Sequence, residues 1–148
     1  MTTSDRRHIG QLLVQTTRHM QAELFRRLAA AGLDGVRAPH THVSAYIKAD
    51  GSRLTDLARD ARMTVPAMLE LVDDLERLGY AERRPDPSDR RAKLVTLTDQ
   101  GWAAMRTARK VIADLEDEYA RMVGRRRFDE FAATFEDLLA RIESRAGD

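Results

Sequence analysis

The residues from Asp86 to Gly101 constrain the fold of this chain more than any other stretch. Pro87 and Ser88 lie between two aspartates, and this composition predicts a turn, because proline fixes φ while aspartate and serine side chains bond to nearby backbone. The run Leu94–Leu97 that follows is rich in residues that favour β-strands. Thr98 then has the side chain and the position of a helix N-cap. The stretch therefore predicts a β-hairpin that leads directly into a helix.

The predicted hairpin concentrates positive charge. Its first arm is expected over Glu82–Pro85, and the segment Arg83–Lys93 holds five cations against two carboxylates. The whole chain has 25 basic and 24 acidic residues, so any attraction for nucleic acid must be local rather than global. A basic hairpin beside a pair of helices is the surface through which a winged helix contacts DNA.

Length and composition limit the alternatives. A chain of 148 residues is expected to form a single domain, here 1–148. The absence of cysteine excludes disulfides, thiolate zinc sites and cysteine-based redox sensing. The segment Met1–Arg7 leads into a helix without the apolar core of a signal peptide, and no apolar run approaches the roughly 20 residues of a membrane span. We therefore expect a cytoplasmic protein without membrane contact.

Apolar residues recur at three- and four-residue steps through most of the chain, and this period predicts helices. The first helix is expected over 4–31, with Ser4 as its cap and Gly32 at its end. A second helix is expected from about Pro39 to Ala49. The fold is therefore expected to be mainly α.

The middle of the chain carries two further helix starts. Ser52–Leu54 is a candidate short strand that could join the hairpin, and Thr55 is expected to cap the helix that follows. Thr64 and Pro66 together mark the start of another helix, which ends at Gly79. Its expected core stripe consists of Met68, Leu71, Val72, Leu75 and Leu78.

The C-terminal third is predicted to form two long helices, Thr98–Val123 and Arg125–Arg145. A winged-helix lobe over 39–98 already has its own core, so the helices in 4–31 and 99–145 expose broad apolar faces. Exposed faces of that size usually mark an interface. We expect these helices to form a homodimer, although they could instead fold back as the core of a monomer.

The order of these motifs resembles that of the MarR family of transcriptional regulators. Asp89–Arg91 and Leu97–Gly101 match the family's wing and the helix start that follows it. Upstream, Leu54–Ala58 and Leu75–Tyr80 fall where the family has the first helix of its helix-turn-helix and the end of its recognition helix. The resemblance covers roughly the whole chain. It implies a mainly α fold with a small β-hairpin wing: a winged helix-turn-helix lobe plus N- and C-terminal dimerisation helices.

The same resemblance implies the function. The family's members are dimeric, sequence-specific DNA-binding regulators, so we expect a double-stranded DNA operator as partner and a repressor that a small-molecule effector releases. The alternative is a winged-helix protein with weak or lost DNA binding that acts as a protein-interaction or small-molecule-binding module.

The predicted recognition helix departs from the family's pattern. Its exposed first turn offers Thr64, Pro66, Ala67 and Glu70 to the major groove. Between Thr64 and Leu78, however, the sequence has four carboxylates and one cation, and carboxylates are repelled by phosphates. Direct base reading is therefore expected to be sparse, with more of the specificity in the wing and in DNA shape. The acids could also belong to a plain solvated face.

The wing arginines are the main candidates for DNA contact. Arg90 and Arg91 at the hairpin tip could enter a narrow minor groove, and Asp89 is expected to pair with Arg91 and orient its guanidinium. A solvated basic loop is the alternative. Other cations expected to contact phosphates are Arg83, Arg84 and Lys93. Arg53 and Arg62 are further candidates, although they could equally be plain surface residues.

The family resemblance also implies an effector pocket where the first, second and fifth helices meet the DNA-binding lobe, suited to a small aromatic acid. The side chains that could reach such a pocket are Arg18, His19, His42, Tyr46, Trp102 and Arg106. Arg18 or Arg106 could pair with a carboxylate, and Trp102 could stack on a ring. Trp102 could equally belong to the dimer core.

Metal binding and catalysis find little support in the sequence. His40 and His42 diverge by about 200° on a helix, so they could share one metal ion only in an extended segment. The chain has no nucleophile elbow, phosphate loop or paired-carboxylate pattern. We expect no metal, no cofactor and no enzymatic activity.

Overall fold

The computed structural model of the protein describes residues 7–146. These residues form six α-helices, one 3-10 helix and three β-strands. They divide into two compact units, the first ending at Arg109 and the second beginning at Lys110. None of the helices in this part of the chain is long and apolar enough to span a bilayer.

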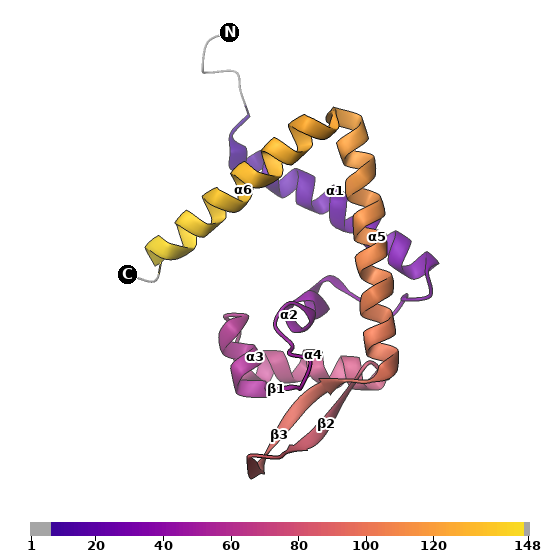
Figure 1. The fold of residues 1–148 in the computed structure, drawn as a ribbon, viewed down its shortest axis with the longest axis vertical. Coiled ribbons are helices and arrows are strands. Elements are labelled where there is room, and N and C mark those ends of the chain that lie inside the picture. The colour runs from indigo at the N-terminus through magenta and orange to yellow at the C-terminus, as the bar shows by residue number, and fades with distance from the viewer. Residues whose placement is uncertain (1–6, 147–148) are drawn as a thin grey trace. The chain divides into compact units, whose positions relative to one another are not determined.

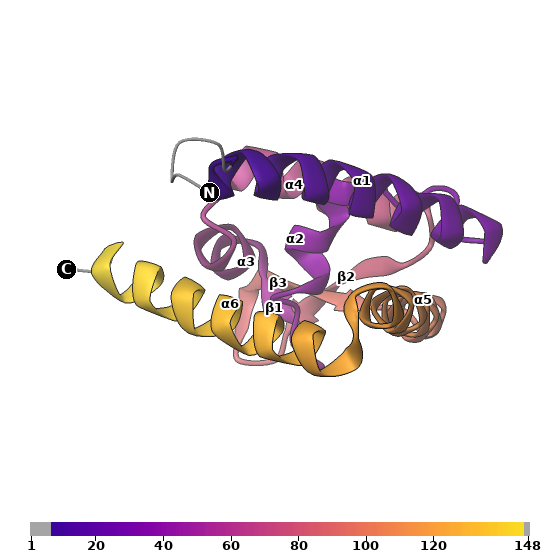
Figure 2. The ribbon, with the colours of Figure 1, turned by 90° about the horizontal axis from the view of Figure 1, so that it is seen from above.

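The first unit holds the helix-turn-helix and the sheet. Its elements are α1 (Ile9–Ala30), the 3-10 helix η1 (Ala38–His40), α2 (Thr41–Ser44), β1 (Ser52–Arg53), α3 (Leu54–Asp60), α4 (Val65–Arg77), β2 (Ala81–Asp86) and β3 (Asp89–Leu97). Figures 1 and 2 show α2, α3, α4 and the strands gathered in one lobe, from which the β2–β3 hairpin projects. The predicted fold class, mainly α with a β-hairpin wing, is confirmed.

One apolar core holds this lobe together. It is made of Val43, Leu57, Ala58, Met68, Leu71, Val72, Leu75, Ala81 and Val95. Met68 and Val72 on α4 are 0% exposed, and burying side chains of this size is the main stabilising contribution in a small lobe. The core stripe predicted for α4 is thus confirmed, with Leu78 partly buried at its edge.

Both ends of α4 are fixed by the residues that the sequence indicated. The Thr64 hydroxyl oxygen accepts a hydrogen bond from the Ala67 N–H at 3.3 Å, and Pro66 occupies the first turn. At the other end Gly79 has φ +77°, a conformation that costs glycine little. The Tyr80 N–H then donates to the Leu75 carbonyl at 2.9 Å, which closes the helix.

The sheet is antiparallel with the strand order β1-β3-β2. Ser52 lies opposite Val95 in the short β1–β3 pair, so the predicted additional strand is confirmed over two residues. In the β2–β3 pair Ala81 lies opposite Leu97, and the register shifts between Pro85 and Asp86. The strands run almost to the tip, so the hairpin is longer than its apolar run predicted.

The junction from the hairpin into α5 (Asp99–Val123) is built on Thr98. Its hydroxyl oxygen accepts a hydrogen bond from the Gly101 N–H at 3.0 Å, and its O–H donates to the Gly79 carbonyl at 2.6 Å. The predicted cap is therefore confirmed, and the same side chain also joins the start of α5 to the end of α4.

Two predicted helix starts are wrong. The first helix begins at Ile9, after the extended residue His8, and Ser4 lies outside the described residues. Thr55 does not cap α3, because the helix already begins at Leu54 and the extended residue before it is Arg53 at the end of β1. Pairing with β3 thus determines where the strand stops and the helix begins.

The predicted helix over Pro39–Ala49 is also wrong, because it breaks into η1 and the four-residue α2. The chain has to turn here to deliver β1 to the sheet. The Lys48 N–H donates to the Ser52 hydroxyl oxygen at 3.0 Å, and Gly51 adopts φ +100°. These contacts stabilise the turn, although the spacing of apolar residues in the sequence favours a continuous helix.

The second unit contains the end of α5 and α6 (Arg125–Ala146), joined at Gly124 with φ +93°. Arg125 donates to Asp117 at 2.7 Å across this joint. The ends predicted for both helices are confirmed to within one residue. No residue of α6 is buried in the described chain, and Phe131 is 58% exposed although its ring stacks on Phe135.

Candidate nucleic-acid interface

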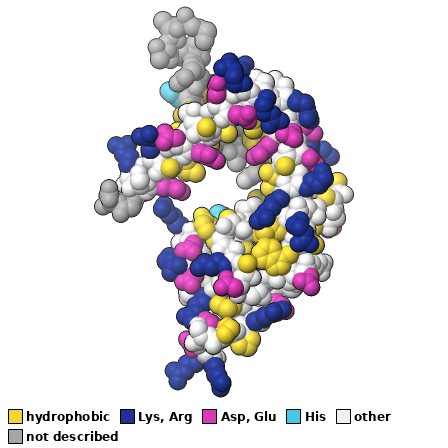
Figure 3. Space-filling view, in the orientation of Figure 1, with side chains coloured by type: hydrophobic (Ala, Val, Ile, Leu, Met, Phe, Trp, Pro, Cys, Tyr) yellow, Lys and Arg dark blue, Asp and Glu magenta, His cyan; other side chains and the backbone are white. Residues whose placement is uncertain are grey.

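The tip of the hairpin presents free positive charge. Arg90, Arg91 and Lys93 are exposed, and no ion pair joins them to another of the described residues. Figure 3 shows basic side chains gathered at the far end of the hairpin. Asp89 does not orient the Arg91 guanidinium as predicted; its carboxylate instead accepts the backbone N–H of Arg91 at 3.0 Å. Asp89 therefore shapes the turn and leaves the arginine side chains free.

A buried carboxylate fixes the hairpin just below its tip. Asp86 is 5% exposed and accepts from the N–H and hydroxyl of Ser88 at 2.8 and 2.7 Å. It also accepts from Nε and Nη2 of Arg53 at 2.9 and 2.6 Å. The bonds from Ser88, followed by the bond from Arg53, lower the pKa of Asp86 to about 2.

The same contact gives Arg53 a partner inside the lobe, although the sequence predicted that Arg53 could contact a phosphate. Its guanidinium lies on Asp86, and this partner raises the pKa of Arg53 above its usual value. Because β3 lies between β1 and β2, the Arg53 side chain reaches across the sheet. Arg53 is thus engaged in holding the hairpin to the start of α3.

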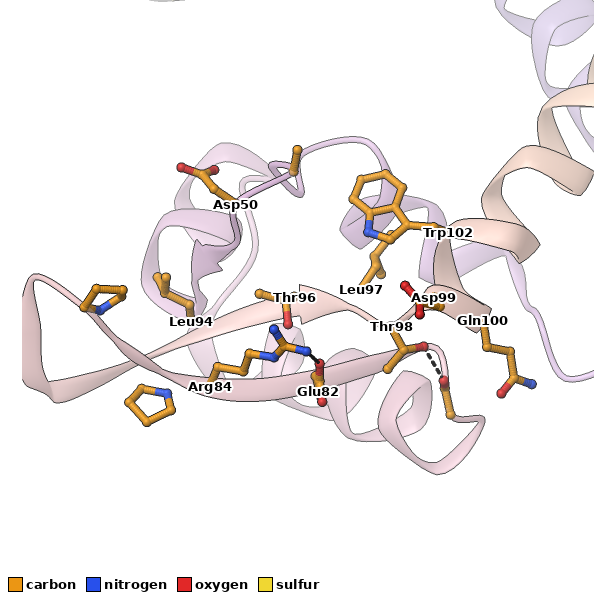
Figure 4. A pocket seen from close by; sticks show the side chains of 14 residues that line it. Asp50, Glu82, Arg84, Leu94, Thr96, Leu97, Thr98, Asp99, Gln100 and Trp102 are labelled. Atoms are coloured by element: carbon orange, nitrogen blue, oxygen red, sulfur yellow. Dashed lines mark hydrogen bonds and ion pairs between the residues drawn. The ribbon is translucent and has the colours of Figure 1, made fainter.

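Neighbouring arginines on β2 lie on opposite faces of the sheet. Arg83 donates to Asp73 at 2.6 Å and to Glu76 at 2.8 Å, both on α4. Arg84 is paired with Glu82 on the other face, as Figure 4 shows, and its side chain is 66% exposed. Arg84 can therefore reach a phosphate with little rearrangement, whereas Arg83 would first have to leave both carboxylates.

The remaining carboxylate in the second half of α4 is also paired. Asp74 binds Arg37 and Arg77, and it lies 3.4 Å from Nε2 of His40. His40 is buried, and its Nδ1 accepts the backbone N–H of Arg37 at 3.0 Å. Burial, followed by the charge of Arg37, lowers the pKa of His40, so its ring is neutral at pH 7.

Most of the acidity of α4 is therefore paired with arginines. Within residues 7–146, Glu70 is the one α4 carboxylate without an ion-pair partner, and it is exposed. Thr64 and Pro66 are exposed beside it, while Ala67 is half-buried. Arg62, another phosphate candidate, is exposed just before the helix. The first turn of α4 thus carries no charged side chain of its own, and Glu70 lies in the turn that follows.

Two of the six effector candidates line separate grooves of the first unit. Arg18 lines a groove of about 570 Å³ along α1. Trp102 lines a different groove, of about 710 Å³, between Asp50, the outer face of the hairpin and the first turn of α5 (Figure 4). The other four are exposed on the surface: His19, His42, Tyr46 and Arg106. A shared aromatic-acid pocket for these residues stays a prediction.

The two histidines near η1 do not face a common ion. His40 uses both ring nitrogens inside the lobe, while His42 is exposed. Within the part of the chain that the structure describes, no three histidine, aspartate or glutamate side chains are grouped to hold a metal.

Comparison with known proteins shows that other proteins share this arrangement. Residues 48–93, from just before β1 to the second arm of the hairpin, match the model of the MarR family. The DNA-binding lobe of this chain is therefore similar to that of the MarR family. A curated relative is the uncharacterized HTH-type transcriptional regulator YdcH of Bacillus subtilis (strain 168), 28% identical over 112 residues, which cover 74% of this chain and 76% of the relative.

Solved structures share the MarR fold over most of the chain. The transcriptional repressor CouR bound to a 23-mer DNA duplex is 22% identical, with a TM-score of 0.70 over 89% of this chain and 92% of that one. CouR from Rhodococcus jostii RHA1 bound to p-coumaroyl-CoA is 24% identical, with a TM-score of 0.69 over 93% and 94%. At these identities the likeness establishes the MarR fold, including the helices outside residues 48–93.

Proposed function

We propose that this chain is a homodimeric, sequence-specific DNA-binding transcriptional regulator that represses until a small molecule releases it. The observation that carries the proposal is the wing tip, where Arg90, Arg91 and Lys93 are exposed and unpaired within the described chain while the hairpin below them is fixed by Asp86. Free cations on an anchored support suit a contact with DNA backbone and minor groove. We propose a cytoplasmic binding protein rather than an enzyme.

The first turn of α4 supplies the second DNA contact of the proposal. Thr64 and Pro66 are exposed and uncharged, and Ala67 is accessible in part. Such side chains can contact a thymine methyl group or a phosphate. The alternative, a winged helix without DNA binding, was motivated by the acidic α4, and the internal pairing of Asp73, Asp74 and Glu76 weakens that motive.

Exposed apolar side chains support the homodimer. In α1, Ile9 and Val14 are 59% and 71% exposed, and in α6, Leu139 and Ile142 are 52% and 55% exposed. Surfaces of this kind are usually covered by a partner. A second copy of the chain would also present two DNA-binding lobes to a symmetric operator.

In vitro selection from random DNA tests DNA binding and identifies the preferred sequence in the same experiment. The full chain is incubated with a library of random duplexes, and the enriched duplex is compared with a random one by fluorescence anisotropy. We expect at least a thousandfold preference, roughly the lower end for specific DNA-binding proteins. A chain that enriches no sequence would contradict the proposal.

Light scattering tests the homodimer. We expect a mass of about twice 16.8 kDa at micromolar concentration. Leu12→Glu or Leu138→Glu should produce monomers or aggregates, because each places a charge on an apolar helix face. A well-folded wild-type monomer would exclude this assembly.

The effector can be tested through the single tryptophan of the chain, Trp102. The complex of CouR with p-coumaroyl-CoA supports testing aromatic acids and their thioesters. Salicylate and p-coumaroyl-CoA should change the fluorescence of Trp102 and release the selected duplex, and Arg18→Ala or Arg106→Ala should abolish both effects. A ligand can release DNA only if it binds the DNA-incompetent state more tightly. If neither signal changes at millimolar concentration, the aromatic effector is excluded.

A further inference from the structure

We propose that Arg83, with Asp73 and Glu76 of α4, forms a strut that sets the position of the wing against the recognition helix. Arg83 would then be a positioning residue for DNA reading and not a contact to phosphate. This inference rests on the proposed function and assigns a role to the carboxylates of α4.

The geometry of the strut suits an arginine. Asp73 and Glu76 are separated by three residues and therefore share one face of α4. The two terminal nitrogens of Arg83 divide between them, with Nη2 at 2.6 Å from Asp73 and Nη1 at 2.8 Å from Glu76. A planar guanidinium can span two carboxylates in this way, whereas a lysine ammonium acts as a single point charge.

The position of Arg83 in the sheet opposes a phosphate contact. Successive residues of a strand point to opposite faces, so β2 directs Arg83 toward α4 and Arg84 away from it. The Arg83 side chain is 27% exposed, against 66% for Arg84. Binding a phosphate would require Arg83 to break two charge-assisted hydrogen bonds, which are stronger than neutral ones.

A second ion pair, between Arg53 and Asp86, also holds the wing in place. Arg83 holds β2 to α4 in the middle of the strand, and the bond from Arg53 to Asp86 holds the end of β2 to the start of α3. The hairpin is thus fixed at two separate points, and the residues left outside both are those of its tip. The wing and the first turn of α4 can then meet two DNA grooves at a fixed separation.

The test measures discrimination, defined as the affinity for the selected duplex divided by that for a random duplex. Arg83→Gln should lower discrimination about tenfold, because the wing and the first turn of α4 can then no longer fit the two DNA grooves at the same time. The pair Asp73→Asn and Glu76→Gln should lower discrimination by a similar factor, although it makes the protein more positive and tightens binding to the random duplex. All three substitutions together should lower it no further, since the strut is already broken.

The opposite role predicts different results. If Arg83 contacts a phosphate, Arg83→Gln should weaken both duplexes equally and reduce the slope of log affinity against log salt by about 1. The carboxylate variant should then leave discrimination unchanged. Either of these results overturns the strut.

Arg84→Gln is the matched control, because it removes the same charge one residue away on the other face of the sheet. It should weaken both duplexes alike. Circular dichroism and thermal unfolding establish that each variant is folded, and Arg83→Lys, which keeps the charge but not the fork, replaces Arg83→Gln if that variant unfolds. A wild-type chain without discrimination would overturn the proposed function and the strut together, whereas loss of the strut alone leaves wild-type discrimination intact.

Discussion

The recognition helix α4 and the wing use their charged residues in opposite ways. In α4, Asp73, Asp74 and Glu76 are all bound by arginines, two of which come from other parts of the chain. In the wing, Arg90 and Arg91 have no ion-pair partner within the described residues, although the arms beneath them are extensively bonded. One element is neutralised and the other is left charged.

This difference separates structural charge from functional charge. An ion pair inside a lobe fixes one element against another, while an unpaired exposed cation is available to an incoming polyanion. The composition of a helix therefore says little about its field until its partners are known. In this chain the attraction for DNA is expected at the wing tip, and α4 is expected to contribute shape and neutral contacts.

The largest expected effect comes from the buried face of α4. Met68→Ala should lower the free energy of unfolding by about 2–5 kcal/mol, because a fully buried side chain is lost from the core and leaves a cavity. Urea denaturation followed by circular dichroism measures it. Arg90→Ala is the comparison, since it lies outside the core and should leave the unfolding midpoint unchanged. Equal destabilisation by both would mean that the wing tip is part of the folded core.

The wing tip should dominate DNA binding. Arg91→Ala should reduce the free energy of binding to the selected duplex by about 1–3 kcal/mol if its guanidinium enters a groove. Lys93→Gln should instead weaken all duplexes alike and reduce the salt slope by about 1. Anisotropy titrations at several salt concentrations separate the two effects. Unchanged affinity of Arg91→Ala would remove the wing from the set of DNA-reading elements.

Glu70 tests whether α4 is truly neutral toward DNA. Glu70→Arg should tighten binding to a random duplex and steepen its salt slope by about 1, because the substitution replaces a repelled charge by a contact. If Glu70 instead accepts from a cytosine amine, the same variant should lose preference at one base pair of the selected site. Glu70→Gln is the control for charge alone. No change in any of these measurements would place Glu70 away from the DNA.

The smallest effect is a pH dependence confined to the wing. The pKa of Asp86 is lowered to about 2, so its stabilising contribution is complete above the ordinary aspartate pKa of about 4 and is lost as the pH falls through about 2. The Ser88 amide, which donates to Asp86, should report this titration in proton–nitrogen NMR spectra. Asp86→Asn should abolish it. A midpoint near 4 in the wild-type chain would mean that Asp86 is not held by these bonds.

Sequence separation decides which of these features could be predicted. The caps at Thr64 and Thr98 are visible because each side chain bonds a backbone N–H three residues ahead. Helical periodicity likewise revealed the core stripe of α4. Such patterns depend on the local chain alone, so the sequence displays them directly.

The ion pairs of the interface could not be predicted in the same way. Arg83 and Asp73 are ten residues apart, Arg53 and Asp86 are 33 apart, and Arg37 and Asp74 are 37 apart. They meet only because the sheet packs on α3 and α4, and nothing local distinguishes Arg53 from the free cation Arg90. Packing also shortened α2. The spacing of apolar residues favours a longer helix there, but the chain must turn so that β1 can pair with β3.

The close contact between the start of α5 and the end of α4 limits which substitutions this protein would tolerate. A side chain at Gly101 would collide with the carbonyl oxygen of Tyr80, which is backbone and cannot swing aside. Position 101 should therefore accept no other residue in a saturation library, whereas Arg90 and Arg91 should accept many as long as only folding is selected. Position 101 would then be constrained by the fold itself, through a backbone contact between the start of α5 and Tyr80, just after α4.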